Sequence, residues 1–194
     1  AQQQKRVLHV EANVPASALY KSYHMPGRFD RDFFAIDLMS DVLSRGQSSR
    51  LYQKLVKEKE IFTSLSSFTL GTIDPGMLVV SGRVRDGISL EDAEAEVDAL
   101  VSDVIKNGVH AHELDKVKNQ ALATLAFGEV EVMNRAMNLA FAALSGDVNT
   151  VNEEAEKIKA VTAEDIQHAA RQVLREDNAS VMYYNSVDSR QKIS

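Results

Sequence analysis

The sequence predicts an α+β fold, in which a mostly antiparallel β-sheet carries its helices packed on one face. Strand patterns dominate the chain up to residue 85, and a series of helical patterns then runs to one returning strand. Neither an internal repeat, a low-complexity tract nor a linker divides the chain. We therefore expect residues 1–194 to form a single domain that is ordered from about residue 6 to residue 187.

The first half of the chain is predicted to combine two pairs of strands with two helices. Apolar residues cover most of the circumference of the first helix, so this helix should be buried on most sides. Ser48 or Ser49 is the expected N-cap of the second helix. In chain order, the expected elements are strands at Val7–Val10 and Ala18–Tyr23, helices at Asp30–Ser44 and from the capping serine to about Lys59, and strands at Ile61–Gly71 and Met77–Arg85.

The second half is predicted to be helical apart from its last strand. Gly108 is the expected C-cap of the first of these helices, and Thr162–Asp165 resembles a capping box before the last one. In chain order, the expected elements are helices at Leu90–Lys106, Ala111–Gly128, Val132–Leu144, Val151–Lys159 and Ala163–Arg175, and a strand at Ala179–Tyr184.

The first helix of the second half is acidic. Its acids, which we expect to face outward, are Glu91, Asp92, Glu94, Glu96, Asp98 and Asp103. They form either an ordinary solvated face or a surface that attracts basic peptides. The solvated face is the simpler interpretation.

Composition and charge argue against several classes of protein. The net charge of -6 argues against a nucleic-acid-binding surface. The absence of cysteine rules out disulfides, thiolate zinc sites and a cysteine nucleophile. No run of about eighteen apolar residues is present to span a membrane. The chain starts without Met or a signal peptide, so we expect a fragment of a longer protein, and both bacterial compartments, periplasm and cytoplasm, are compatible with it.

The segment Leu43–Pro75 carries the most specific motif. It matches the pattern G-x-S-S-R-L-x-x-x-L, followed later by Ser, through Gly46, Ser48, Ser49, Arg50, Leu51, Leu55 and Ser64. This pattern resembles a half-subunit of the pitrilysin family of zinc metallopeptidases, the inverzincins, which includes insulin-degrading enzyme and the mitochondrial processing peptidase. Later family segments are matched in order by Val109–Gln120, Lys159–Ile166 and Ala179–Val181, so the resemblance covers nearly the whole chain.

The resemblance implies a LuxS/metallohydrolase-like half-subunit fold, in which two homologous halves close into a chamber. The catalytic half of such enzymes carries the zinc box H-x-x-E-H, which is absent from this sequence. The helix expected at Asp30–Ser44 occupies the place of that box, and its carboxylates have no imidazole partner: Asp30, Asp32, Asp37 and Asp41. We therefore expect a non-catalytic, C-terminal-type domain with no catalytic or metal-binding residues, and zinc only in the partner half.

The chain also departs from the family pattern at two further positions. In many non-catalytic halves an Arg and, seven positions later, a Tyr hold the scissile peptide in an oxyanion-type role. Val56 and Thr63 stand at these positions here, and neither side chain can replace them. Lys57 and Lys59 would take over only if the register slipped.

Two residues of the motif are candidates for substrate binding or fold support, Arg50 and Tyr52. Arg50 either binds substrate carboxylates as a bidentate fork or ties its helix to a neighbouring loop. Both types of half share the motif, which favours the fold role.

Other polar residues have similar double interpretations. His110 and His112 should point in different directions at a solvated helix start, although two such imidazoles could also bind a metal. Arg83 and Arg85 alternate along a strand, either as a substrate-facing patch or as a solvated strand end.

The sequence thus predicts the non-catalytic domain of a zinc metalloendopeptidase. This domain would complete a peptide-binding chamber opposite a zinc-bearing homologous half, and by itself it would not cleave peptides. The expected partners are that homologous domain or subunit and a peptide substrate. The alternative is a catalytically dead scaffold subunit of the same fold. An unrelated α+β ligand-binding module is a third interpretation.

Overall fold

The computed structural model describes residues 2–187. Its five strands form one sheet in the order β1-β5-β2-β4-β3. β1 pairs with β5 in parallel, and the other three pairings are antiparallel. The predicted α+β class with a mostly antiparallel sheet is confirmed.

The strands lie within two residues of their predicted boundaries. They are β1 (Arg6–Ala12), β2 (Ala18–Met25), β3 (Phe62–Leu70), β4 (Gly76–Val84) and β5 (Ala179–Ser186). Along β2 the buried residues include Leu19, Tyr23 and Met25, while the alternate residues Tyr20 and His24 are exposed. This alternation means that one face of the sheet is packed and the other is open.

The helices follow the predicted order. They are α1 (Phe33–Ser44), α2 (Leu90–Asn107), α3 (Ala111–Gly128), α4 (Val132–Leu144), α5 (Thr150–Ala160) and α6 (Ala163–Val173), with a π-helix η1 (Tyr52–Glu58) and a short 3₁₀ helix η2 (Glu176–Asn178). α1 begins three residues later than predicted, because the preceding residues form a turn. In that turn the backbone N–H of Gly27 donates to Asp30 Oδ2 at 2.6 Å, and that of Phe33 donates to the carbonyl of Asp30 at 3.2 Å.

The predicted serine cap of the second helix is wrong. No side chain caps η1. The Ser48 hydroxyl instead accepts from Lys116 Nζ at 3.0 Å, and the buried Ser49 hydroxyl has no hydrogen-bond partner among the described residues. The N–H of Lys59 donates to the carbonyl of Lys54, five residues back, which is the wider hydrogen-bond pattern of a π-helix.

The other two predicted caps are present. Gly108 closes α2 with a φ of 70°, a left-handed value that favours glycine. Thr162 and Asp165 form a reciprocal capping box before α6. Hydrogen bonds from Thr162 hold the pKa of Asp165 below its ordinary value.

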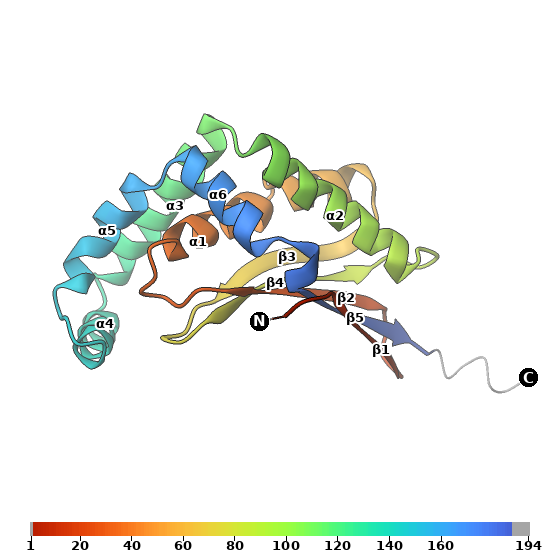
Figure 1. Cartoon of the computed structure of the whole chain (residues 1–194), viewed down its shortest axis with the longest axis horizontal. Helices are drawn as coiled ribbons and strands as arrows, with labels where there is room; N and C mark the ends of the chain where they lie inside the picture. Colours follow the sequence, from red (N-terminus) through yellow and green to blue (C-terminus); the bar gives the residue numbers. More distant parts are fainter. Residues whose placement is uncertain (1, 188–194) are drawn as a thin grey trace, which may run out of the picture.

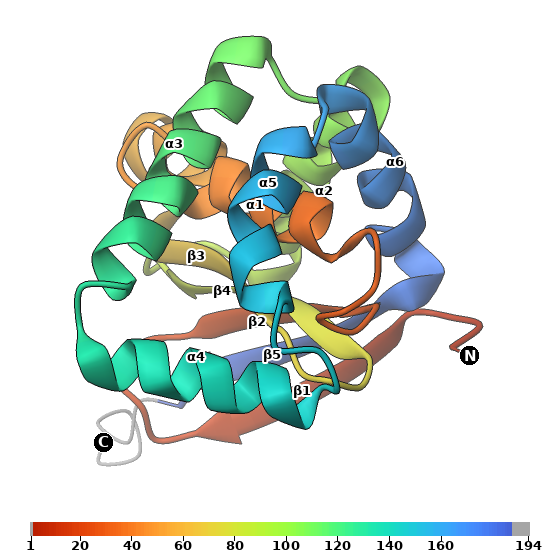
Figure 2. The same ribbon diagram turned by 90° about the vertical axis from the view of Figure 1, so that its left-hand side faces the viewer.

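The domain has two layers and one outlying helix. Helices cover one face of the sheet, and the hydrophobic core lies between them and the strands (Figure 1). α4 lies apart from this helical layer, at one end of the molecule (Figure 2). Within residues 2–187, no helix combines the length and apolar character needed to cross a membrane.

Candidate functional site

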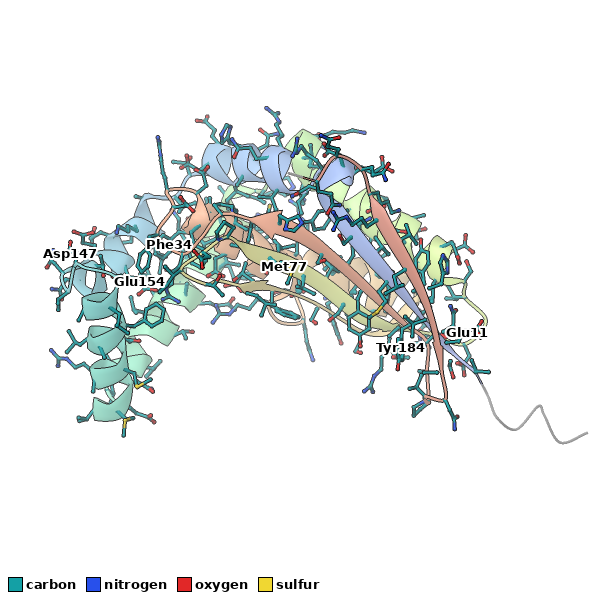
Figure 3. The ribbon with its side chains drawn as sticks, turned by 60° about the horizontal axis from the view of Figure 1, so that its bottom comes forward. Glu11, Phe34, Met77, Asp147, Glu154 and Tyr184 are labelled. Carbon is teal, nitrogen blue, oxygen red and sulfur yellow. The ribbon has the colours of Figure 1, made fainter. Side chains whose placement is uncertain are left out.

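The open face of the sheet is covered by no element among residues 2–187 (Figure 3). Strand register places side chains on it in rows that run across four strands. One row contains Tyr184, Ala18, Arg83 and Ser64, and the next contains Met182, Tyr20, Ser81 and Ser66. Towards the β3–β4 turn, the same face exposes the apolar residues Phe68, Leu70 and Met77. The face is therefore a surface that can receive a partner or a peptide.

The edge strand β3 is partly closed to peptide pairing. The Ser44 hydroxyl of α1 accepts from the backbone N–H of Ser67 at 2.6 Å and lies 2.7 Å from its carbonyl oxygen, to which it donates. Ser40 and Ser67 also share a buried hydrogen bond at 3.2 Å. An extended peptide therefore cannot add to the sheet at Ser67 without breaking these contacts.

The carboxylates of α1 are engaged in structural contacts. Asp37 Oδ1 accepts from the hydroxyl of Thr69 at 2.6 Å, and Asp41 Oδ2 accepts from Arg45 Nη1 at 2.6 Å. Burial raises the pKa of Asp41 despite that partner. No group of three or more His, Cys, Asp or Glu side chains that could hold a metal occurs among the described residues. The residues at the predicted zinc-box position therefore do not fit a catalytic zinc, which needs several converging ligands.

Arg50 links the start of the η1 segment to the loop between α2 and α3. Its Nε and Nη2 donate to the two carboxylate oxygens of Glu113 at 2.8 and 2.7 Å. Nη1 donates to Asp103 at 3.0 Å, and Nη2 also donates to the carbonyl of Gly108 at 3.1 Å. The bonds from Arg50 hold the pKa of Glu113 at about 2. Because every guanidinium nitrogen is engaged, we infer that Arg50 supports the fold.

The residues predicted to stand at the family's Arg and Tyr positions have no comparable chemistry. Val56 packs half-buried against the core. Thr63 is exposed at an irregularity in the β3–β4 pairing, and its hydroxyl donates to the carbonyl of Arg83 at 3.3 Å. Tyr52 is half-buried on η1 and its hydroxyl makes no hydrogen bond within residues 2–187, so its role stays a prediction.

The expectation that His110 and His112 point in different directions is wrong. Their rings stack with centroids 5.6 Å apart and planes 14° apart. His110 is the N-cap of α3 and has an extended backbone, so the angular spacing of a helix does not apply to it. Both side chains are exposed.

Arg83 and Arg85 have different surroundings. β4 ends at Val84, and Arg85 forms an ion pair with Glu60 at 3.6 Å. The side chain of Arg83 makes no hydrogen bond or ion pair within the described part of the chain. Arg83 therefore lies on the open face with no acidic partner among the described residues.

A buried ionic cluster lies between α2 and the sheet, where solvated acids were expected. Glu94 is only 3% exposed. Its carboxylate accepts from Lys21 Nζ and Lys5 Nζ, each at 2.6 Å, and from the hydroxyl of Tyr183. Lys21 Nζ also donates to Asp98 at 2.5 Å. Burial would raise the pKa of Glu94, but these bonds outweigh it and the pKa lies below its ordinary value.

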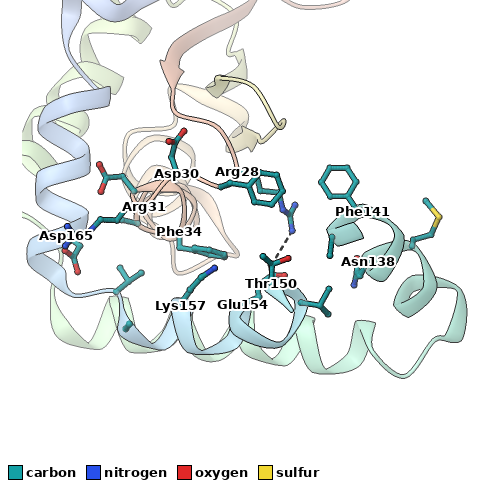
Figure 4. Close-up of a pocket in the computed structure, with 18 residues that line it drawn as sticks. Arg28, Asp30, Arg31, Phe34, Asn138, Phe141, Thr150, Glu154, Lys157 and Asp165 are labelled. Carbon is teal, nitrogen blue, oxygen red and sulfur yellow. Dashed lines mark hydrogen bonds and ion pairs between the residues drawn. The ribbon is translucent and has the colours of Figure 1, made fainter. Parts of the chain in front are cut away.

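A cavity of about 670 Å³ separates α4 and α5 from the start of α1 (Figure 4). Phe34 and Phe141 line it, and Arg28 Nη2 pairs with Glu154 at 3.4 Å across it. Basic and acidic side chains are mixed along its wall: Arg28, Arg31, Lys157, Asp30, Asp32, Glu154 and Asp165. Charge therefore does not select one class of ligand here.

α4 is apolar and almost uncovered. Only Ala142 is buried, whereas Val132 is 83% exposed, Leu144 81% and Met133 72%. Its main neighbour is α5. An exposed apolar surface of this kind is typical of an interaction site.

Comparison with known proteins agrees with this architecture. The family described as "Peptidase M16 inactive domain" matches residues 1–121. The uncharacterized zinc protease YmxG of Bacillus subtilis is 27% identical over 144 residues, which are 73% of this chain and 35% of YmxG. The zinc protease PqqE of Helicobacter pylori is 27% identical over 96 residues, 50% of this chain and 22% of PqqE. The chain therefore spans about a third of YmxG and less of PqqE.

Solved structures share the fold. A protease from Helicobacter pylori superposes with a TM-score of 0.89 at 20% identity, over 95% of this chain and 45% of its own. An inactive peptidase domain from Bordetella parapertussis gives 0.82 at 20% identity, over 92% and 98%. A peptidase M16 inactive domain from Pseudomonas fluorescens gives 0.79 at 20% identity, over 95% and 44%.

The fold and the family match define the class of protein as an inactive peptidase domain of a zinc protease. The chain belongs to the Peptidase M16 inactive domain family. The resemblance to pitrilysin-type peptidases is thereby confirmed.

Proposed function

We propose that this domain docks on a homologous zinc-bearing half and closes the chamber in which that half cleaves peptides. The exposed apolar surface of α4 carries the proposal, together with the open face of the sheet. The zinc and the catalytic residues belong to the partner half, and this domain supplies a wall that holds the peptide.

The surface of α4 supports the docking. Full burial of an aliphatic or Met side chain contributes roughly 1.5–3 kcal/mol. Val132, Met133 and Leu144 are each more than 70% exposed, so a partner that covers α4 gains from all three. The open sheet face adds Phe68 and Met77, at 42% and 39% exposure.

The lengths of the relatives support a partner of similar size. This chain covers 45% of the Helicobacter pylori protease and 44% of the Pseudomonas fluorescens chain. Each of these chains therefore has room for a second unit about as large as this one.

The test combines this chain with the zinc-bearing half encoded in the same or a neighbouring reading frame, recognised by H-x-x-E-H. Association is measured by sedimentation velocity, and cleavage of an unstructured peptide is measured with and without a chelator. The variant with Val132, Met133 and Leu144 all changed to Ser should weaken association and cleavage together. The matched control Val7→Ser removes an exposed apolar side chain on β1 and should change neither. Association unaffected by the triple change would overturn the proposal.

A scaffold role is the second candidate, favoured by Val56 and Thr63 at the positions of the family's Arg and Tyr. A scaffold would associate through the same surfaces. Its complex would show no chelator-sensitive cleavage, which is what separates the two functions.

A further inference from the structure

We propose that the open sheet face contains a carboxylate-binding site centred on Arg83, which takes a carboxylate of a peptide substrate. The inference rests on the proposed function in one respect, because that function makes the open face a wall of the peptide chamber. The binding itself is a property of this chain alone.

The site is a hollow of about 440 Å³ on the open face, where β2 and β3 begin and β4 and β5 end. Ala18 stands between Tyr184 and Arg83 in the same row across the sheet. Its small side chain leaves a depression between two large ones. The β1–β2 connection forms a wall with Val14, Pro15 and Ala16. Tyr184 marks this region in Figure 3, away from α4.

The charge of the hollow is unbalanced. Arg83 is the one charged residue that lines it, and no acidic side chain does so. Arg85, the next arginine along the chain, by contrast pairs with Glu60. An unpaired guanidinium in a protein with a net charge of -6 is a ready partner for an external anion.

Residues with hydroxyl groups line the hollow together with Arg83. The side-chain hydroxyls of Tyr20, Tyr184, Ser64 and Ser81 donate no hydrogen bond within the described residues. A carboxylate has two oxygens and about four acceptor positions, so it can take a bidentate fork from Arg83 and further bonds from these hydroxyls. The donor set fits a carboxylate.

The backbone beneath Arg83 is held in place. Thr63 is the extra residue where the β3–β4 register shifts, and its hydroxyl donates to the carbonyl of Arg83 at 3.3 Å. Gly82 allows β3 to approach, because a Cβ there would lie 2.7 Å from the carbonyl oxygen of Ser64. The backbone of the site is therefore in place before a ligand arrives, which lowers the entropic cost of binding.

These contacts give Arg83 a binding role and no catalytic one. It lies next to Thr63, which replaces the family's Tyr, but nothing in the structure aims it at a scissile bond. A terminal or side-chain carboxylate held here would fix the position of the peptide along the chamber wall.

The experiment is a ¹⁵N NMR titration of the 194-residue chain with three unlabelled hexapeptides that end in leucine. One has a free C-terminus, one is its C-terminal amide, and one is the amide with an internal glutamate. We expect the free acid, the glutamate peptide or both to bind about tenfold more tightly than the plain amide, with shifts at Ser64, Gly82 and Arg83. The two carboxylate-bearing peptides separate terminal from side-chain recognition.

The variant Arg83→Gln should remove the preference for a carboxylate, and the matched control Arg85→Gln should keep it. Arg83 is exposed, so the spectrum of the variant should show an unchanged fold. Equal binding of all three peptides, or a preference that survives Arg83→Gln, would overturn the proposal. The α4 triple variant should bind the peptides like the unaltered chain, so failure of docking and failure of this site are distinguishable.

Discussion

Arg50 and Glu113 lie 63 positions apart in the chain and meet through two hydrogen bonds, Nε to Oε1 at 2.8 Å and Nη2 to Oε2 at 2.7 Å. The fork joins the motif segment after α1 to the start of α3. Glu113 also accepts from the backbone N–H of His110 at 2.8 Å, so the same carboxylate caps α3. One ion pair thus fixes both the π-helical segment and the entry of a long helix.

The substitution Arg50→Lys should destabilise the domain by about 1–3 kcal/mol. Lysine keeps the charge but cannot make the fork to Glu113 and the bonds to Asp103 and Gly108 together. Urea unfolding followed by circular dichroism gives the change in free energy. Arg85→Lys alters an exposed pair with Glu60 and should change it by less than about 0.5 kcal/mol. Equal losses in the two variants would mean that the fork has no special structural role.

Acid should weaken the domain partly through Glu113. Its folded-state pKa of about 2 lies below the ordinary value of 4.5, so its contribution is complete above about pH 5 and disappears as the pH falls towards 2. Glu113→Gln should therefore lower stability at pH 7 and flatten its dependence on pH in this window. Unfolding curves from pH 7 to pH 2 measure both effects. If the variant loses as much stability at low pH as the unaltered chain does, other carboxylates cause the acid sensitivity.

Most of the fold could be predicted because its signals are local. The bounds of α3 and α4 agree with prediction, since Gly108 and Gly146 bracket two apolar periodic runs. α1 begins later than predicted because the Asp30 carboxylate accepts from the backbone N–H of Gly27 and holds a turn, and apolar periodicity does not reveal such a bond. The missing cap at η1 has the same origin, because Ser48 is engaged by Lys116 from distant α3.

The site was less predictable because it depends on register between distant strands. Lys21 lies on the same strand face as the apolar residues Leu19 and Tyr23, and this spacing is the signal that could have placed it in the core beside an acidic partner. Glu94 was assigned to solvent because of its charge, although its spacing from Leu90 and Val97 places it on the buried face of the helix. The pairing of Arg83 with Ala18 and Ser64 follows from the sheet order β5-β2-β4-β3, and the sequence does not specify that order.

The substitution Lys21→Met should cost about 3–5 kcal/mol, because it leaves the carboxylate of Glu94 buried with less compensation. Lys21 and Glu94 are 3% and 4% exposed in their side chains, so water cannot replace the lost partner. Lys54→Met provides the matched control, because its pair with Glu58 is about half exposed on both sides and should contribute about 0.5 kcal/mol or less. Midpoints of urea unfolding measure the difference. A loss no greater than that of the control would mean that Lys5 and Tyr183 suffice to stabilise Glu94.

Adding a methyl group at Gly82 should have the opposite effect from adding one at Gly128. A Cβ on Gly82 would lie 2.7 Å from the carbonyl oxygen of Ser64 and 2.8 Å from the ring of Phe62, so Gly82→Ala must displace β3 and should cost about 1–3 kcal/mol. Gly128 ends α3 with nothing within 4 Å of its Cβ position and no positive φ, so Gly128→Ala should stabilise by about 0.5–1 kcal/mol. Thermal unfolding of both variants measures the two signs. Because β3 and β4 together frame Arg83, Gly82→Ala should also weaken carboxylate binding, whereas Gly128→Ala should leave it unchanged.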